Sequence, residues 1–340
     1  MGDILGNVLQ TLLPGDHIII DDLIFRLHYQ TTTCILIACL AIIIGTRSLD
    51  DVFACFKEDN TRIRSIEPVC YAQNTFTAMK NMSHVMMDIK TPVTVHSHHD
   101  WVLVLLSIQV FIFIAPRYIW KLLESGRMES LVSYIRRPNL SDTDKNLWKQ
   151  EKVNYFTSER HQPPSLYVYA YIVCEILNLV NDLLQISLMD HFLGAVFSTH
   201  GWDILSLIST PSEDRVDALA LVFPTLGLCT LRDLGSWMCH LRFNYMSENT
   251  FVLLWFWYAF LAYVSIINLT QHAPALLSRE IRAQYLQELM LDDSRSEEAR
   301  VVAHSFNLSE WFMLCRIGEN IDTIIFQQLV VDIDRQIHSL

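Results

Sequence analysis

The densest group of potentially reactive side chains lies between His96 and Asp100, where the sequence reads HSHHD. Imidazoles and carboxylates bind transition metals and act as general acids and bases, so a metal site or a catalytic cluster is one interpretation. However, no second pair of ligands stands at zinc-finger spacing, although His84 lies nearby in the sequence. The chain also has no HExxH, P-loop or GxSxG motif. We therefore predict that the protein is not an enzyme and holds neither a metal nor a cofactor.

The composition around this cluster is typical of a membrane protein. Of the 340 residues, 51% are hydrophobic and 18% are charged, and the mean hydropathy is +0.25. A soluble domain usually has about 25% charged residues. The formal net charge of −12 argues against nucleic acid as a partner, because such a partner needs a basic surface. The composition therefore predicts a protein embedded in membrane lipid.

Four segments are apolar over about 20 residues each, the length that spans a bilayer, so we predict an all-α membrane protein with four transmembrane helices. Trp101 begins the second segment as an interfacial anchor would, and Pro116 is expected to kink that segment or to end its regular part. The predicted order is an N-terminal helix (1–26), a first span (27–45), a first outer loop (46–100), a second span (101–120), a middle loop (121–165), a third span (166–189), a second outer loop (190–250), a fourth span (251–270) and C-terminal helices (271–340).

The distribution of lysine and arginine predicts the side of the membrane on which each loop lies. The two ends of the chain and residues 117–165, which include the middle loop, together carry 16 of these residues, and the two outer loops carry 9. Cytoplasmic segments are enriched in lysine and arginine. We therefore expect both termini and the middle loop in the cytoplasm, where the middle loop and the C-terminal helices would form a helical cap.

The cysteines agree with this orientation. Four of the eight form one pair in each outer loop: Cys55 and Cys70, then Cys229 and Cys239. Disulfides persist outside the cell and are rare in the cytosol, so we interpret the two pairs as a disulfide framework of the extracellular loops. Four cysteines allow three connectivities, and their spacing does not choose among them. Four unpaired thiols are the alternative.

The third predicted span carries polar side chains on one helical face. Glu175, Asn178 and Asp182 follow one another at spacings of three and four residues. An ionisable group that faces lipid is costly, so these side chains must face protein or water. Hydrogen bonds to neighbouring spans are one explanation, and the lining of a pore or of a boundary between subunits is the other.

Five segments match a known family in the same order along the chain. They are DDLIFRLHYQTT (21–32) at the first span, PRYIWKLLESGRM (116–128) after the second, CEILNLVNDLLQISLMDHFLG (174–194) in the third, LWFWY (254–258) in the fourth and EWFMLCRIGENIDTIIF (310–326) near the end. Each match alone is weak. Together, around four spans and with two cysteines in each outer loop, they resemble the innexins, the channel subunits of invertebrate gap junctions.

The resemblance implies a large-pore channel in the plasma membrane that passes ions and small metabolites. Its ring would contain identical subunits, or this chain together with other innexins. Such a ring acts alone as a hemichannel, or it docks with an opposing hemichannel on a neighbouring cell to form a gap junction. The resemblance also implies a nested disulfide pairing, in which Cys55 bonds to Cys239 and Cys70 bonds to Cys229.

The N-terminal sequence DILGNVLQTLL has apolar residues on one helical face and stops at Pro14 and Gly15. In the channels that this chain resembles, the N-terminal helix folds into the pore. That resemblance implies that Asp3 forms a ring of carboxylates, which would favour cations. The alternative is a helix that lies on the cytoplasmic surface of the membrane.

The outer loops depart from the family pattern. Tyr71 replaces the tryptophan that usually follows the second cysteine, and only nine residues separate Cys229 from Cys239. In this compactness the chain is similar to the viral innexins of polydnaviruses, and a divergent insect member is the alternative. Asn81 begins an N-glycosylation sequon. A glycan there would obstruct docking and favour the undocked hemichannel.

A four-span adhesion protein is the rival to a channel, but the Cys-Cys-Gly motif of tetraspanins and the first-loop signature of claudins are absent from the sequence.

The histidine cluster is interpreted as the end of an extracellular loop. Because histidine titrates near neutral pH, His98 and His99 at a channel mouth would make currents sensitive to extracellular acid or zinc.

Overall fold

The protein is described here by a computed structural model. The described residues are 18–48, 53–56, 67, 69–70, 75–78, 94–96, 99–158, 166–193, 197–199, 201–202, 223, 226–231 and 235–339. The chain divides into two compact units, and each unit combines separate stretches of sequence. The first unit contains residues 1–31, 114–179 and 263–340, and the second contains residues 32–113 and 180–262.

Four helical stretches are long and apolar enough to cross a membrane, and they coincide with the four predicted spans. They are Leu23–Gly45, Trp101–Glu124, Tyr167–Phe192 and Phe243–Leu277. Each extends several residues beyond the predicted segment at one end or at both, because caps and packing set the end of a helix, whereas hydropathy marks only its apolar middle. The elements that form these spans are α2 (Leu23–Arg26), the π-helical turn η1 (Leu27–Thr31), α3 (Thr32–Ser48), α5 (His99–Glu124), α8 (Tyr167–Phe192) and α11 (Arg242–Leu277).

Pro116 does not end its helix, because α5 continues through it to Glu124. Proline has no backbone N–H, so the carbonyl of Ile112, four residues earlier, loses its helical donor. The side chain of Asn181 on α8 donates to that carbonyl, with 3.5 Å between Nδ2 and the oxygen. Of the two predicted outcomes at Pro116, a kink or an end, the end is thus not observed.

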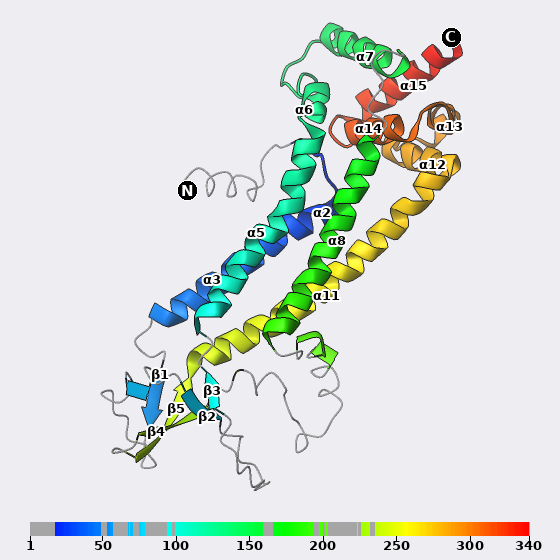
Figure 1. Ribbon diagram of the computed structural model, residues 1–340. Helices are drawn as coiled ribbons and strands as arrows, with labels where there is room; N and C mark the ends of the chain where they lie inside the picture. Colours follow the sequence, from blue (N-terminus) through cyan, green and yellow to red (C-terminus); the bar gives the residue numbers. More distant parts are fainter. Residues whose placement is uncertain are drawn as a thin grey trace. The chain divides into compact units, whose positions relative to one another are not determined.

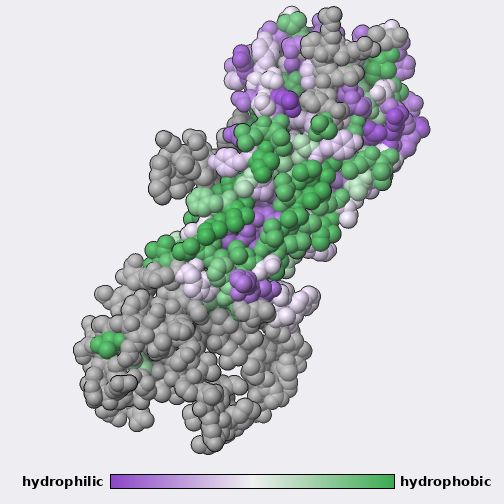
Figure 2. Space-filling view, in the orientation of Figure 1, coloured by the Kyte–Doolittle hydropathy of each residue, from purple (hydrophilic) through white to green (hydrophobic). Residues whose placement is uncertain are grey.

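Apolar side chains cover the outward faces of the spanning helices. Figure 2 shows hydrophobic residues gathered over α5, α8 and α11. Large apolar patches on a surface mark a membrane or protein contact, so these faces are suited to lipid and to neighbouring subunits. Exposed members of the patch are Val104, Ile108 and Phe111 on α5, Val173, Val180 and Leu184 on α8, and Leu253, Phe260 and Ile266 on α11.

The first unit ends in a bundle of short helices, which Figure 1 shows beyond α5 and α8. Its central helix, α14, is buried on all sides, as expected for a helix with apolar residues around its whole circumference. Asn307 and Glu310 form a capping box that starts this helix. The helices of the bundle are α6 (Arg127–Val132), α7 (Asp142–Thr157), α12 (Arg279–Met290), α13 (Ser296–Ser305), α14 (Leu308–Gly318) and α15 (Thr323–Ser339).

Gly318, the last residue of α14, packs directly against α15. A Cβ atom at this position would lie 2.7 Å from Cζ of Phe326. Gly318→Ala is therefore expected to push the two helices apart, to cost about 1–3 kcal/mol, and to lower the thermal unfolding temperature of the purified protein. The matched control is Gly45→Ala, which adds the same methyl group where, beyond its own helix backbone, no atom of the described residues lies within 4 Å. If the two variants unfolded at the same temperature, this packing would be wrong.

The second unit contains a five-stranded antiparallel sheet that the sequence did not predict. The strand order is β1-β5-β4-β2-β3, so strands from the first outer loop flank the hairpin of the second loop on both sides. These strands are only three to seven residues long, and such short runs lack a clear alternating pattern. The strands are β1 (Phe53–Phe56), β2 (Thr75–Ala78), β3 (Thr94–His96), β4 (Leu226–Leu231) and β5 (Gly235–Leu241).

Candidate functional site

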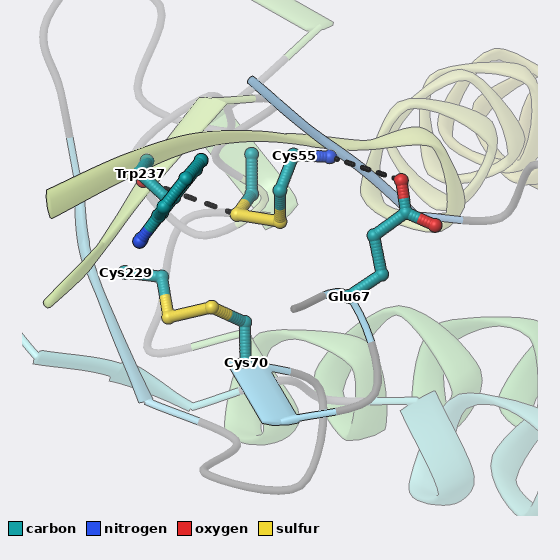
Figure 3. Close-up of a disulfide and its surroundings, with 6 residues drawn as sticks. Cys55, Glu67, Cys70, Cys229 and Trp237 are labelled. Carbon is teal, nitrogen blue, oxygen red and sulfur yellow. Dashed lines mark hydrogen bonds between the residues drawn. A yellow bond between two sulfur atoms is a disulfide. The ribbon is translucent and has the colours of Figure 1, made fainter. Parts of the chain in front are cut away.

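Two disulfides join the two outer loops. Cys55 bonds to Cys239 and Cys70 bonds to Cys229, and all four residues are fully buried. Figure 3 shows both bonds beside Trp237, whose side chain is only 4% exposed. The nested connectivity that the family resemblance implied is therefore confirmed.

The strand register explains why these cysteines meet. Cys55 of β1 lies directly opposite Cys239 of β5, and in an antiparallel pair the Cβ atoms of opposed residues point the same way. Cys229 lies on β4, the other neighbour of β5, and reaches Cys70 from there. The backbone N–H of Cys55 also donates to Glu67, with 3.4 Å between N and Oε1. The sheet and the disulfides thus form one structure made from both loops.

Trp101 lies near the start of α5, at the end of the bundle that carries the sheet. Its ring stacks on Phe192 of α8, with 5.4 Å between ring centroids, and on Phe251 of α11, with 6.5 Å between centroids. The residue therefore packs α5 against two other spans. His99 and Asp100 precede it as the first two residues of α5.

The polar face of α8 points into the subunit. Glu175, Asn178 and Asp182 are 5%, 2% and 0% exposed. Side chains that are this deeply buried in a single chain face its interior, and they do not face a lumen that would form between chains. Asn178 and Asp182 make no side-chain hydrogen bond to the described residues, whereas Glu175 contacts a neighbouring span.

Glu175 belongs to a polar cluster made by three spans in the first unit. Its Oε1 accepts from Nδ2 of Asn268 at 2.9 Å, and its Oε2 lies 3.1 Å from Nδ1 of His272. The same Nδ2 of Asn268 donates to Oδ2 of Asp22 at 2.7 Å. Asp22 also caps the first helix, since its Oδ1 accepts from the N–H of Phe25 at 2.7 Å. One amide group thus bridges two carboxylates.

A small cavity of about 10 Å³ adjoins this cluster, and Glu175 and Asn268 line it. His28 and Asn178, both at least 98% buried, line it as well. His28 uses Nε2 in a 2.6 Å contact with Oγ of Ser265. Its Nδ1 and both polar atoms of the Asn178 side chain have no hydrogen-bond partner among the described residues. A cavity of this size has room for roughly one water molecule.

Sequence reasoning missed most of this cluster. His28, Asn268 and His272 stand alone among apolar residues, and single polar residues of this kind are common in long spans. The spacing of four between Asn268 and His272 was a usable signal, because it places both on one face of a helix. Only the tertiary fold shows that this face meets Glu175.

The N-terminal arm is fixed to the C-terminal helices. The side chain of Asn320 bonds to both backbone groups of Ile19, at 2.6 Å from Ile19 N to Oδ1 and at 2.7 Å from Nδ2 to the Ile19 oxygen. The indole of Trp120 donates to the oxygen of Ile20 at 2.9 Å. The residues that lead out of the N-terminal segment therefore move with the helical bundle.

Arg316 connects that bundle to the third span. Cζ of its guanidinium lies 5.0 Å from the ring centroids of Tyr171 on α8 and Phe312 on α14. Its Nη1 donates to Oε2 of Glu319 at 2.7 Å. Burial acts to lower the pKa of Arg316, but the neighbouring Tyr171 and Glu319 hold it above its ordinary value. Arg316 therefore stays charged inside the bundle.

Three predicted functional residues lie outside the described residues: Asp3, Asn81 and His98. Their predicted roles in the pore, in glycosylation and at the channel mouth stay predictions.

Comparison with known proteins gives a consistent result over the whole chain. The Innexin family model matches residues 21–337. Innexin inx2 of Drosophila melanogaster is 31% identical and the alignment covers 99% of this chain and 96% of the relative. Innexin inx2 of Schistocerca americana is 29% identical, with 100% and 99% covered, and Innexin shaking-B of Drosophila melanogaster is 27% identical, with 96% and 92% covered.

Proposed function

This chain belongs to the innexin family, and from that premise we propose that it is the subunit of a large-pore channel for ions and small metabolites. Innexins are gap junction channel subunits. Family membership and the four spans together make this chain a multi-pass membrane protein. The observation that carries the proposal is the pair of disulfides between the two outer loops, since they build one rigid face beyond four spans. Such a face can meet a second ring, and the exposed apolar helix faces can meet neighbouring subunits.

We place both termini in the cytoplasm. The excess of lysine and arginine in the ends and in the middle loop supports this orientation. So does the chemistry of the outer loops, because their disulfides need an oxidising compartment. The contact between Ile19 and Asn320 is consistent with both ends lying on one side. Cys315, in the bundle on that side, is buried, which raises the pKa of its thiol.

The N-terminal segment is proposed to enter the pore, with Asp3 in a ring near its narrow part. Asp3→Lys would replace a ring of negative charges with positive ones, and the preference for cations is expected to fall or reverse. The measurement is the reversal potential of channel currents in a potassium chloride gradient. Asp16→Lys, beyond the turn at Pro14 and Gly15, is the matched control. An unchanged reversal potential for Asp3→Lys would argue against the ring.

Docking is proposed to depend on the glycan at Asn81. The wild-type protein should lose mass on deglycosylation, take up dye into single cells and pass little dye between paired cells. Asn81→Gln should gain dye transfer between pairs, and Asn74→Gln, in the same loop but outside the sequon, should not. Efficient transfer by fully glycosylated protein would disprove this part of the proposal. It would leave a docked gap junction as the function.

A further inference from the structure

The cluster of Asp22, Glu175 and His272 has the composition of a metal site. One ligand atom from each of the three residues lies within 4.8 Å of the other two. Asp22 immediately precedes the first span, Glu175 lies in the third span, and His272 lies near the end of the fourth. We propose that this cluster binds one divalent transition-metal ion, of which Zn²⁺ is the representative, and that the ion clamps the three spans together.

The present hydrogen bonds show where the ion would lie. Nδ2 of Asn268 donates to both carboxylates, at 2.7 Å to Asp22 and 2.9 Å to Glu175. This partly positive amide group therefore occupies the position between two carboxylates that a cation would take. The ion would displace this donor, and the Asn268 side chain would turn away from the two carboxylates.

The ligand types select the class of metal. A neutral imidazole favours zinc and its neighbours among the transition metals, whereas magnesium and calcium prefer sites made of oxygen only. The atoms Nδ1 of His272 and Oε2 of Glu175 are 3.1 Å apart, close to the separation of roughly 3.3 Å between two ligands of a tetrahedral zinc ion. The ligand atom of Asp22 lies within 4.8 Å of these two atoms and would need to move closer to them to complete the site.

The adjoining cavity is a second, independent indication of a ligand. Zinc sites with three protein ligands keep a fourth position for water, and the cavity beside Glu175 has room for roughly one water molecule. Asn178 and His28 line this cavity. Both polar atoms of the Asn178 side chain and Nδ1 of His28 are buried and have no hydrogen-bond partner among the described residues. They would hold the water that completes the coordination, as outer groups do at known metal sites.

The ion has a route of entry from the solvent. The side chain of Glu175 is only 4% exposed, but that of His272 is 36% exposed. His272 lies five residues before the last residue of α11, and its ligand atom lies within 4.8 Å of that of Asp22. A metal can thus reach the cluster through His272 without passing through the hydrophobic interior.

Zinc binding to the full-length protein, purified in detergent without a histidine tag, tests the proposal. Equilibrium dialysis followed by elemental analysis should find a zinc ion that binds one to one with the chain and is not displaced by excess Mg²⁺ or Ca²⁺. His272→Gln and Glu175→Gln should weaken this binding at least tenfold. Zinc should also raise the unfolding temperature of the wild-type protein by several degrees.

The matched control is His304→Gln. His304 and Glu280 form a similar contact, with 3.2 Å between Nε2 and Oε1, but among the described residues no third ligand joins them, and they lie exposed on the helical bundle. This variant should bind zinc as the wild type does. A cooperative thermal unfolding transition, measured for each variant without metal, shows that the variant is folded. Wild-type protein that binds no zinc, or a folded His272→Gln protein that binds it equally well, would overturn the proposal. Neither result depends on channel activity.

Discussion

Replacing Cys55 and Cys239 together with serine is expected to unfold the five-stranded sheet and, on the proposed function, to abolish channel activity. The bond closes a loop of 184 residues, and loss of a disulfide that closes so long a loop costs about 3–5 kcal/mol in the chain-entropy account. The two strands that it joins, β1 and β5, are also direct neighbours in the sheet. Limited proteolysis of the outer loops, with dye uptake by the same cells, measures the effect.

The control for this double variant is Cys34→Ser. Cys34 is a free, exposed thiol on α3, so its loss should change neither proteolysis nor dye uptake. Peptide mapping without reduction should still find Cys70 linked to Cys229 in the double variant. Normal activity of the double variant would contradict the role given to the paired loops.

Arg316→Ala is expected to have the second largest effect. It removes the ion pair with Glu319 and the contacts with the rings of Tyr171 and Phe312. Removal of one partner of a buried ion pair costs about 3–5 kcal/mol. We expect a loss near the lower value, about 3 kcal/mol, because the Glu319 side chain is partly exposed to water. The helical bundle should separate from α8, and the unfolding temperature of the purified protein should fall by several degrees.

Arg335→Ala is the matched control for this variant. Arg335 pairs with Asp332 at 3.3 Å on the surface of α15, where the arginine side chain is 74% exposed. Exposed pairs contribute about 1 kcal/mol or less, so this variant should unfold close to the wild-type temperature. If Arg316→Ala did the same, the bundle would not depend on the buried guanidinium.

The sequence predicted the parts of the fold that depend on hydropathy. Four apolar segments of the right length appear as four helices, because the composition of such segments is a direct consequence of contact with lipid. The helix ends were less accurate. Asp22 caps α2 five residues before the predicted start of the first span, and a cap is a local hydrogen bond that a hydropathy window does not register.

Other features depend on contacts between distant residues and were beyond the reach of local patterns. The spacing of the cysteines left three connectivities open, and the antiparallel register of β1 and β5 places Cys55 opposite Cys239. The polar face of α8 was recognised, but its partners were not. Asn268 lies 93 residues from Glu175 in the chain, so only the packing of α8 against α11 shows that the two side chains meet.

Permeation through the purified protein tests the central claim most directly. Vesicles that contain the assembled ring should release a small fluorescent dye and retain a large dextran, because a channel of defined width separates the two by size. Release of the small dye alone is the result that we predict. Retention of both probes by vesicles with inserted protein, or release of both, would contradict the proposal that this chain forms a channel.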